Sequence, residues 1–424
     1  MTTASAVRSS TSTTAESPFN ALRYRGYRIY AIGQSLASTG TWMGSIALDW
    51  MALQLTNSPT AVGITMALQF LPILFLGVHG GLLADRYPKR RLLLITQSVN
   101  AGLTATLAVL IIAGAIRIEY VYLFALLTGL VFVVDAPTRQ VFATEVVPAS
   151  HLRGAVSLNA TVFQATRLVG PALAGVLIGT AGTGWVFVCN ALCYLGPTMA
   201  LLRLRPGDLT PAPPAGREPR AFRTAGRYVW QRPRVFWTIV LVGVIGTFGL
   251  NFPIVLTAIA TESFQGTAGM YGLFNIMLAI GSASGALVAG AAASTRLRRI
   301  VLFGGLFGAI QALAAAAPNL ATFLPLLVGL GFANLAFQAL ANSSVQLWVD
   351  PEMRGRVMGL YLLVFTGGTP IGAPIIGAIT NDFGARLGMA VCGLVPAAAA
   401  GAIVLIQVWS RRRAVRLACA APAG

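Results

Sequence analysis

The chain has 424 residues, of which 56% are hydrophobic and 10% are charged, and its mean hydropathy is +0.74. A water-soluble fold of this length would have too little polar surface to cover itself. The net charge of +18 resides in basic loops that alternate with nearly uncharged ones, so it does not indicate a nucleic-acid partner. The composition therefore indicates an integral membrane protein.

The expected elements follow from apolar runs that are long enough to cross a bilayer. Lipid cannot satisfy free backbone amides, so these runs must be helices. About twelve transmembrane helices are expected, at 27–54, 60–84, 91–115, 119–146, 153–180, 185–203, 235–261, 269–293, 299–317, 320–347, 355–380 and 387–410. The fold class is therefore an all-α membrane protein.

The chain divides into five expected segments. Residues 1–22 begin with a polar Ser- and Thr-rich run and are expected to form a disordered cytoplasmic tail. A six-helix bundle at 23–204 and another at 234–411 are separated by a Pro-, Gly- and Arg-rich central linker at 205–233, with a short amphipathic helix expected at 221–231. Residues 412–424 form the C-terminal tail. Basic residues recur at every second loop. By the positive-inside rule we expect a cell-membrane protein whose two termini both lie on the cytoplasmic side.

The first expected helix carries a polar stripe. Its members recur at steps of four, three, four and four residues, which places them on one helix face: Gln34, Ser38, Thr41, Ser45 and Asp49. We expect this face to line a water-filled cavity, although polar contacts between helices are the alternative. Asp49 has no evident partner, so it is a candidate for proton coupling or for attracting a cationic substrate; a simply solvated acid remains the alternative.

The loop after the second helix joins a small residue, an acid and a group of cations: Gly81, Asp85, Arg86, Lys89, Arg90 and Arg91. Gly81 would allow this helix end to approach a neighbour closely. The cations fix topology. Whether the loop also acts as a cytoplasmic gate or only sets topology is left open by the residues alone.

Further ionisable residues lie inside expected spans, where a charge costs about 2.5 to 3.5 kcal/mol on insertion scales and needs a partner, water or a proton. Asp135 lies one helical turn from Arg139 and near the expected depth of Arg167. This arrangement favours a structural ion-pair cluster over a proton site.

Two other helices carry notable patterns. In the fifth, Gly170, Pro171 and Gly175 allow the helix to bend and to pack closely, and simple close packing is an equal alternative. In the tenth, polar residues recur every four positions at Asn334, Gln338, Asn342 and Gln346. We expect the first three to line the same cavity as the stripe of the first helix, with helix-to-helix contacts as the alternative.

The two halves of the chain repeat one another. Arg153-Gly154 recurs as Arg354-Gly355, and Gly170 and Gly175 recur as Gly372 and Gly377, at an offset of roughly two hundred residues. Such internal duplication is typical of secondary transporters, whose substrate path lies where the halves meet.

The loop Gly81-Leu82-Leu83-Ala84-Asp85-Arg86 with Lys89-Arg90-Arg91 resembles the signature loop of the major facilitator superfamily. The run from Gly170 to Gly175 is similar to the Gly-Pro motif of its exporters. Shorter phrases such as Gly33-Gln34, Leu158-Asn159 and Asp135-Ala136-Pro137 resemble the branch of enterobactin and macrolide exporters.

The resemblance implies a fold of two pseudo-repeated six-helix bundles that works by alternating access. It also implies that Asp85 faces the start of helix 11 near Arg356 when the cytoplasmic side is shut, and that the Gly-Pro motif limits leakage. Two departures are Pro88, where the family usually has Gly, and the equivalent loop near 295–299, which keeps cations but has no acid.

The expected function is that of a secondary active transporter, a proton-coupled exporter of a small amphipathic drug, macrolide or siderophore. The alternatives are a facilitator or importer on the same fold and a transport-inactive membrane sensor or scaffold. The chain is not expected to be an enzyme, since it has no nucleotide-binding loop and no metal-ligand spacing, and no cofactor is expected. The expected partners are the lipid bilayer, a small-molecule substrate and protons, with the protein acting as a monomer.

Overall fold

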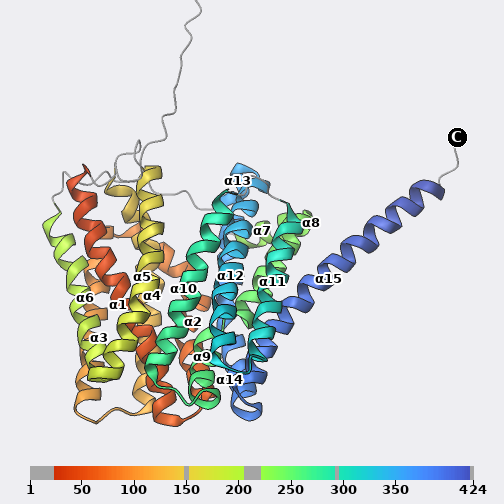
Figure 1. The fold of residues 1–424 in the computed structure, drawn as a ribbon. Helices are drawn as coiled ribbons and strands as arrows, with labels where there is room; N and C mark the ends of the chain where they lie inside the picture. The colour runs from red at the N-terminus through yellow and green to blue at the C-terminus, as the bar shows by residue number, and fades with distance from the viewer. Residues whose placement is uncertain (1–22, 148–151, 205–220, 292–295, 421–424) are drawn as a thin grey trace, which may run out of the picture.

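The computed structural model describes residues 23–147, 152–204, 221–291 and 296–420 (Figure 1). The expected N-terminal tail, most of the central linker and the end of the C-terminal tail lie outside these residues. The described part of the chain is helical and has no strands. This confirms the all-α class predicted from the apolar runs.

The first six helices form one bundle, the N-terminal bundle. They are α1 (Arg25–Thr56), α2 (Pro59–Arg86), α3 (Lys89–Ile112), α4 (Ile118–Glu145), α5 (Leu152–Ala181) and α6 (Thr183–Arg203). In this bundle α1 packs against α5 and α6, α2 packs against α4, and α3 packs against both α4 and α6. Each helix begins and ends within a few residues of the expected span.

The remaining helices form the C-terminal bundle, which lies beside the first (Figure 1). They are α7 (Ala221–Trp230), α8 (Pro233–Val244), α9 (Phe252–Ala258), α10 (Ala268–Ala291), α11 (Leu297–Ala315), α12 (Leu320–Trp348), α13 (Pro351–Gly367), α14 (Thr369–Phe383) and α15 (Ala385–Ala420), with π-helical turns η4 (Ile245–Gly249) and η5 (Ile259–Ser263). The main contacts join α10 to α12 and α11 to α12 and α15.

Two spans that the sequence predicts as single helices are divided. The span 235–261 consists of α8, η4, α9 and η5, and the span 355–380 consists of α13 and α14. The two interruptions pack together, because the backbone of Gly372 lies directly against the carbonyl oxygen of Thr247. Asn251 stabilises the same region by donating from Nδ2 to the Thr247 and Phe248 carbonyl oxygens at 2.8 and 3.0 Å.

The helices have the length and composition of membrane spans. Among the described residues, nine helical segments are long and apolar enough to cross a bilayer, and α1, which carries the polar stripe, is not one of them. Large apolar side chains such as Phe75, Leu302 and Leu405 are exposed on the outside of the bundles. A water-soluble monomer rarely exposes so many apolar side chains, whereas a bilayer covers them.

The two bundles meet at one end of the molecule, where α2 and α10 begin and α14 ends. A β-carbon placed on Gly63 of α2 would lie 2.5 Å from the carbonyl oxygen of Ala373 in α14. At the surface of the same end, Ser58 donates from Oγ to Oδ1 of Asn381 at 2.8 Å. We refer to this end as the closed end, and to the opposite end, where the basic loops lie, as the cation-rich end.

Candidate transport pathway

A cavity of about 470 Å³ lies inside the N-terminal bundle. Its walls come from α1, α2, α3, α4 and α6, and Thr366 of α13 is the lining residue from the other bundle. Six aromatic side chains contribute, together with hydroxyl and amide groups: Trp42, Phe70, Phe124, Phe132, Phe187 and Tyr194. A volume of this size with apolar walls and a few polar groups is typical of sites for small organic molecules.

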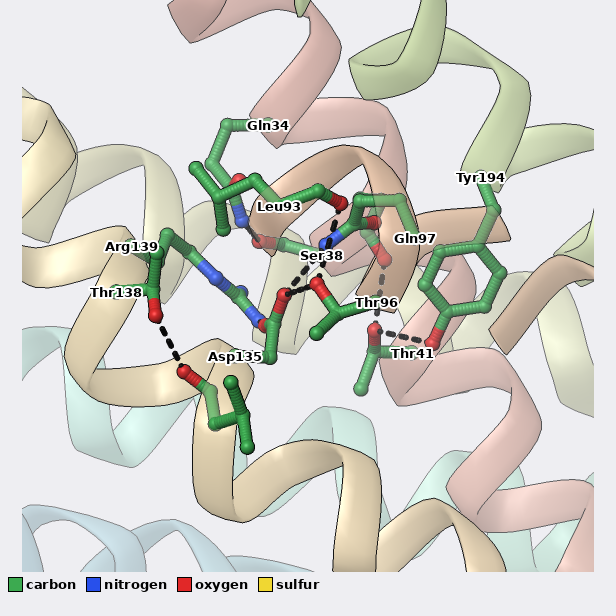
Figure 2. Close-up of polar contacts among 12 residues, drawn as sticks. Gln34, Ser38, Thr41, Leu93, Thr96, Gln97, Asp135, Thr138, Arg139 and Tyr194 are labelled. Carbon is green, nitrogen blue, oxygen red and sulfur yellow. Dashed lines mark hydrogen bonds and ion pairs between the residues drawn. The ribbon is translucent and has the colours of Figure 1, made fainter. Parts of the chain in front are cut away.

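The polar stripe of α1 forms part of this cavity. Ser38, Thr41 and Ser45 line it, and the Thr41 hydroxyl lies 3.3 Å from the Tyr194 hydroxyl of α6 (Figure 2). Gln34 is buried next to the cavity and donates from Nε2 to Ser38 Oγ at 3.3 Å. The helical spacing thus places most of the stripe on one wall.

The polar residues of α12 lie elsewhere. Asn334 is buried, and Gln338 donates to its Oδ1 at 2.8 Å, on a helix that packs against α10 and α11. None of Asn334, Gln338 and Asn342 lines the 470 Å³ cavity. The periodicity of polar residues is the same in α1 and α12, and only the packing of the bundles distinguishes the two faces.

Asp135 and Arg139 form an ion pair at the wall of the cavity (Figure 2). Asp135 is only 1% exposed, and its Oδ1 also accepts from Thr96 Oγ1 at 2.7 Å and from Gln97 Nε2 at 2.8 Å. The Arg139 cation and two hydrogen-bond donors offset the desolvation cost of this carboxylate. A buried carboxylate is stable in an ion pair when it has such partners.

The donors on α3 are residues that the sequence analysis did not single out. Thr96 and Gln97 begin a series of buried polar positions on α3, continued by Asn100 and Thr104. All four are buried, and Asn100 and Thr104 line the cavity. Polar residues at helical spacing are a signal that the sequence does contain, because Thr96, Asn100 and Thr104 lie four residues apart.

Two buried polar atoms of residues that line the cavity have no hydrogen-bond partner in the described part of the chain. They are Oδ1 of Asn190 in α6 and Nε of Arg139 in α4. Asn190 lies against α1, because a β-carbon on Gly40 would come within 2.7 Å of its Oδ1. One acceptor and one donor are therefore available to a ligand whose polar atoms reach this wall.

Asp49 lies one residue beyond Leu48, the last α1 residue that lines the cavity. It is 4% exposed, and its Oδ2 accepts from the Tyr271 hydroxyl of α10 at 3.5 Å. This contact joins the N-terminal bundle to the C-terminal bundle at the closed end. Local sequence patterns contain no sign of this partner, because the two residues lie 222 positions apart.

The cations of the Gly81 to Arg91 loop bind within their own bundle. Lys89 Nζ lies 3.5 Å from Glu145 Oε1 at the end of α4. Arg90 donates from Nε to the Leu201 carbonyl oxygen at 2.8 Å, at the end of α6. Arg86 and Arg91 are exposed, and the side chain of Asp85 lies outside the described ones. These contacts tie the cation-rich ends of α3, α4 and α6 together.

The close approach expected at Gly81 is absent from this conformation. A β-carbon placed on Gly81 would meet none of the described atoms within 4 Å. The neighbouring helix α13 instead comes close to α2 farther along, where a β-carbon on Gly367 would lie 3.0 Å from Leu74 Cδ1. The two bundles are therefore packed tightly at the closed end but not at Gly81.

The Gly-Pro motif of α5 lies between the two bundles. Gly170 faces α1, where a β-carbon would lie 3.1 Å from the Thr39 carbonyl oxygen. Gly175 faces α10, where a β-carbon would lie 3.2 Å from the Cα of Gly272. Pro171 lies inside the same helix. The side chain of Arg167, earlier in α5, is not among those described.

The sequence matches the model of the transmembrane secretion effector family over residues 16–418. The staphyloferrin A transporter of Staphylococcus aureus is 29% identical over 59% of this chain, and the match spans 63% of that protein, slightly less than two thirds of its length. The enterobactin exporter EntS of Salmonella typhimurium is 23% identical, covering 83% of this chain and 85% of its own. The multidrug efflux pump Tap of Mycolicibacterium fortuitum is 26% identical, and the match covers 82% of this chain and 87% of Tap.

The fold is similar to that of a solved bacterial homologue of the human lysosomal transporter Spinster. The TM-score is 0.69 at 13% sequence identity, and the alignment covers 90% of this chain and 95% of the other. The two-bundle fold and the family match support the same assignment. The chain belongs to the transmembrane secretion effector family of the major facilitator superfamily, and it is a multi-pass membrane transporter rather than an enzyme.

Proposed function

We propose that this chain is a proton-coupled exporter of small amphipathic molecules that works by alternating access. The observation that carries the proposal is the 470 Å³ cavity, whose lining combines aromatic side chains, several hydroxyl groups and an ion pair with a buried acid. An amphipathic drug, macrolide or siderophore has an apolar body for the aromatic walls and polar atoms for Asn190 and Arg139. The names of the relatives, which include siderophore and multidrug transporters, support the same substrate class.

The orientation follows from the distribution of charge. The positive-inside rule places the cation-rich end, and with it both termini, in the cytoplasm. The closed end then faces outward, so the bundles are packed as in an inward-facing transporter. Export requires the opposite arrangement as well, in which the closed end separates and the cation-rich end closes.

The Gly81 to Arg91 loop is our candidate for the gate at the cytoplasmic side. When the cation-rich end closes, α2 would approach the start of α13 at Gly81, and Asp85 would face the positive N-terminal end of that helix. A carboxylate at a helix N-terminus contributes about 0.3 to 2 kcal/mol. This contact would stabilise the outward-facing conformation. In the present conformation α13 does not approach α2 at Gly81.

Asp49 is our candidate for the proton-coupling site. Asp135 has Arg139, Thr96 and Gln97 as partners and is suited to a structural role. Among the described residues, Asp49 has only the Tyr271 hydroxyl as a hydrogen-bond partner. Proton entry down 100 mV supplies about 2.3 kcal/mol, and each pH unit adds about 1.4 kcal/mol. One proton would therefore sustain a substrate gradient of about a few hundredfold for a neutral substrate.

The test is uptake into everted membrane vesicles that contain the protein. Ethidium, erythromycin and enterobactin serve as probes, each with and without an imposed proton gradient. We expect uptake of at least one probe class that stops when the gradient is collapsed. Uptake without dependence on the gradient would indicate a facilitator, and accumulation in the opposite direction would indicate an importer.

Single substitutions in the two acids locate the coupling site. Asp49→Asn should abolish the gradient-dependent uptake of the probe. If Asp49→Asn and Asp135→Asn both retain coupled uptake, neither acid is the site. A transport-inactive sensor or scaffold predicts no flux of any compound, which a resistance screen in an efflux-deficient host would reveal.

A further inference from the structure

Asp49 is buried at the contact between the two bundles, where they must separate during transport. Its carboxyl group lies 3.5 Å from the Tyr271 hydroxyl and is 4% exposed, while Tyr271 is fully buried. Tyr271 precedes Gly272, whose backbone packs against Gly175 of α5. The acid and this close approach of the two bundles are therefore part of one interface.

The surroundings of Asp49 provide little compensation for a charge. Tyr271 is the titratable side chain that interacts with it among the described residues, through one long hydrogen bond. None of the described titratable side chains of α2, α4 and α6, which also pack on α1, interacts with Asp49, and α9 has none. Burying an ionised carboxylate without a cation or several donors costs several kcal/mol.

The neutral acid fits the same site at lower cost. A protonated carboxyl group can both donate and accept, and the Tyr271 hydroxyl can do the same, so the pair stays hydrogen-bonded without a buried charge. Separation of the bundles would instead expose Asp49 to water, where the ionised form is well solvated. The two conformations therefore prefer different protonation states of one residue.

We propose that Asp49 and Tyr271 form a proton-dependent contact that holds the closed end together. Proton binding to Asp49 favours the packed interface, and proton loss favours its separation. The proposal rests on the proposed function and adds its conformational consequence: a proton taken up from outside closes the outer end. Release must then occur toward the cavity, which Ser45 and Leu48 line beside Asp49.

The test measures the closed end directly rather than transport. Ser58 and Asn381 are in contact at the surface of this end, so nitroxide labels on S58C and N381C report the separation of the bundles. The native cysteines, Cys189, Cys193, Cys392 and Cys419, are replaced first. Pulsed EPR distances are recorded in lipid nanodiscs at acidic, neutral and alkaline pH. A distance is preferred to disulfide formation because thiol reactivity itself depends on pH.

We expect the short-distance population to dominate at acidic pH and to decline as the pH rises. Asp49→Asn, a neutral group of the same shape, should hold the short distance at every pH. Tyr271→Phe should reduce the short-distance population at acidic pH, because it removes the hydrogen-bond partner. Glu262→Gln is the matched control: this acid lies at the same end but accepts from the Ala385 amide within its own bundle at 3.1 Å, so the pH response should persist.

Two results would overturn the proposal. One is a pH response in Asp49→Asn that equals that of the parent protein, and the other is loss of the response in Glu262→Gln. Either result is independent of vesicle uptake. The proposed Asp49–Tyr271 contact can therefore be refuted while the proposal of export remains supported. Conversely, a pH-dependent distance that Asp49→Asn abolishes would support the contact even if no tested probe is transported.

Discussion

Gly175 of α5 lies against Gly272 of α10, so closely that a β-carbon on Gly175 would come within 3.2 Å of the Cα of Gly272. The two residues belong to different bundles, and their contact belongs to the closed end. Small residues allow helix backbones to approach in this way within a membrane. In this structure the Gly-Pro motif of α5 is therefore part of the interface between the bundles.

A larger side chain at Gly175 should prevent this end from closing. We expect Gly175→Val to shift the S58C/N381C distance to longer values and to reduce probe export by about tenfold, the effect of about 1.4 kcal/mol. Gly179→Val is the matched control on the same helix, because a β-carbon there meets nothing within 4 Å. Equal behaviour of the two variants would show that the Gly175 contact does not matter for closure.

Removing one partner of the Asp135 and Arg139 pair should destabilise the N-terminal bundle. Asp135→Asn leaves the Arg139 charge without its partner, and breaking a buried pair in this way typically costs about 3 to 5 kcal/mol. The measurement is thermal unfolding of the purified protein in detergent. The double variant Asp135→Asn with Arg139→Gln should lose less than the sum of the single losses, because the two residues interact.

The control for this pair is Glu119→Gln, an exposed acid at the start of α4. Surface substitutions usually change stability by less than about 0.5 kcal/mol. A loss in Asp135→Asn no greater than that of the control would contradict a structural role for the ion pair.

A bulky residue at Gly81 should act only on the conformation that is closed at the cation-rich end. In the present structure a β-carbon at Gly81 has no neighbour within 4 Å, so Gly81→Leu should fold and give the same S58C/N381C distance. Probe export should nevertheless fall, because the proposed approach of α2 to α13 is blocked. Gly102→Leu, also without a neighbour within 4 Å, should transport normally. Unchanged export in Gly81→Leu would argue against the gate.

Filling the cavity should block the substrate rather than the fold. Ser45 lines the cavity, whose volume is about 470 Å³, and an indole side chain there would occupy much of it. We expect Ser45→Trp to abolish probe binding, measured by tryptophan-quenching titration with ethidium, while the melting temperature changes little. Ser98→Trp, on the exposed face of α3, should bind as the parent protein does. Retained binding in Ser45→Trp would place the substrate elsewhere.

The sequence predicted the boundaries of most helices well, because lipid requires a long apolar run for each span. It was less informative where a span is divided. The α8 to η5 region and the α13 to α14 junction are divided next to Pro253 and Pro370, which stand in the first turns of α9 and α14. Proline removes a backbone donor from a helix, but membrane helices tolerate proline where neighbouring helices stabilise them, so the residue alone does not decide whether a span continues. The packing of Gly372 against Thr247 in the other divided span is visible only in the tertiary structure.

The candidate site shows the same distinction. The stripe of Ser38, Thr41 and Ser45 and the pair of Asp135 and Arg139 follow local helical spacing, which the sequence contains. Asn334 and Gln338 have the same spacing, yet they lie outside the cavity. Spacing identifies a polar face but not the surface that this face contacts.

The sequence by itself determined that this protein is a helical membrane transporter, because composition, hydrophobic length and the charge of alternate loops are sums over local residues. The tertiary structure alone decided which end of the two bundles is closed. It also brought Tyr271 to Asp49 across 222 positions of the chain. That pairing depends on how two separately formed bundles pack, and the energy of such packing is distributed over many small contacts that no single segment encodes.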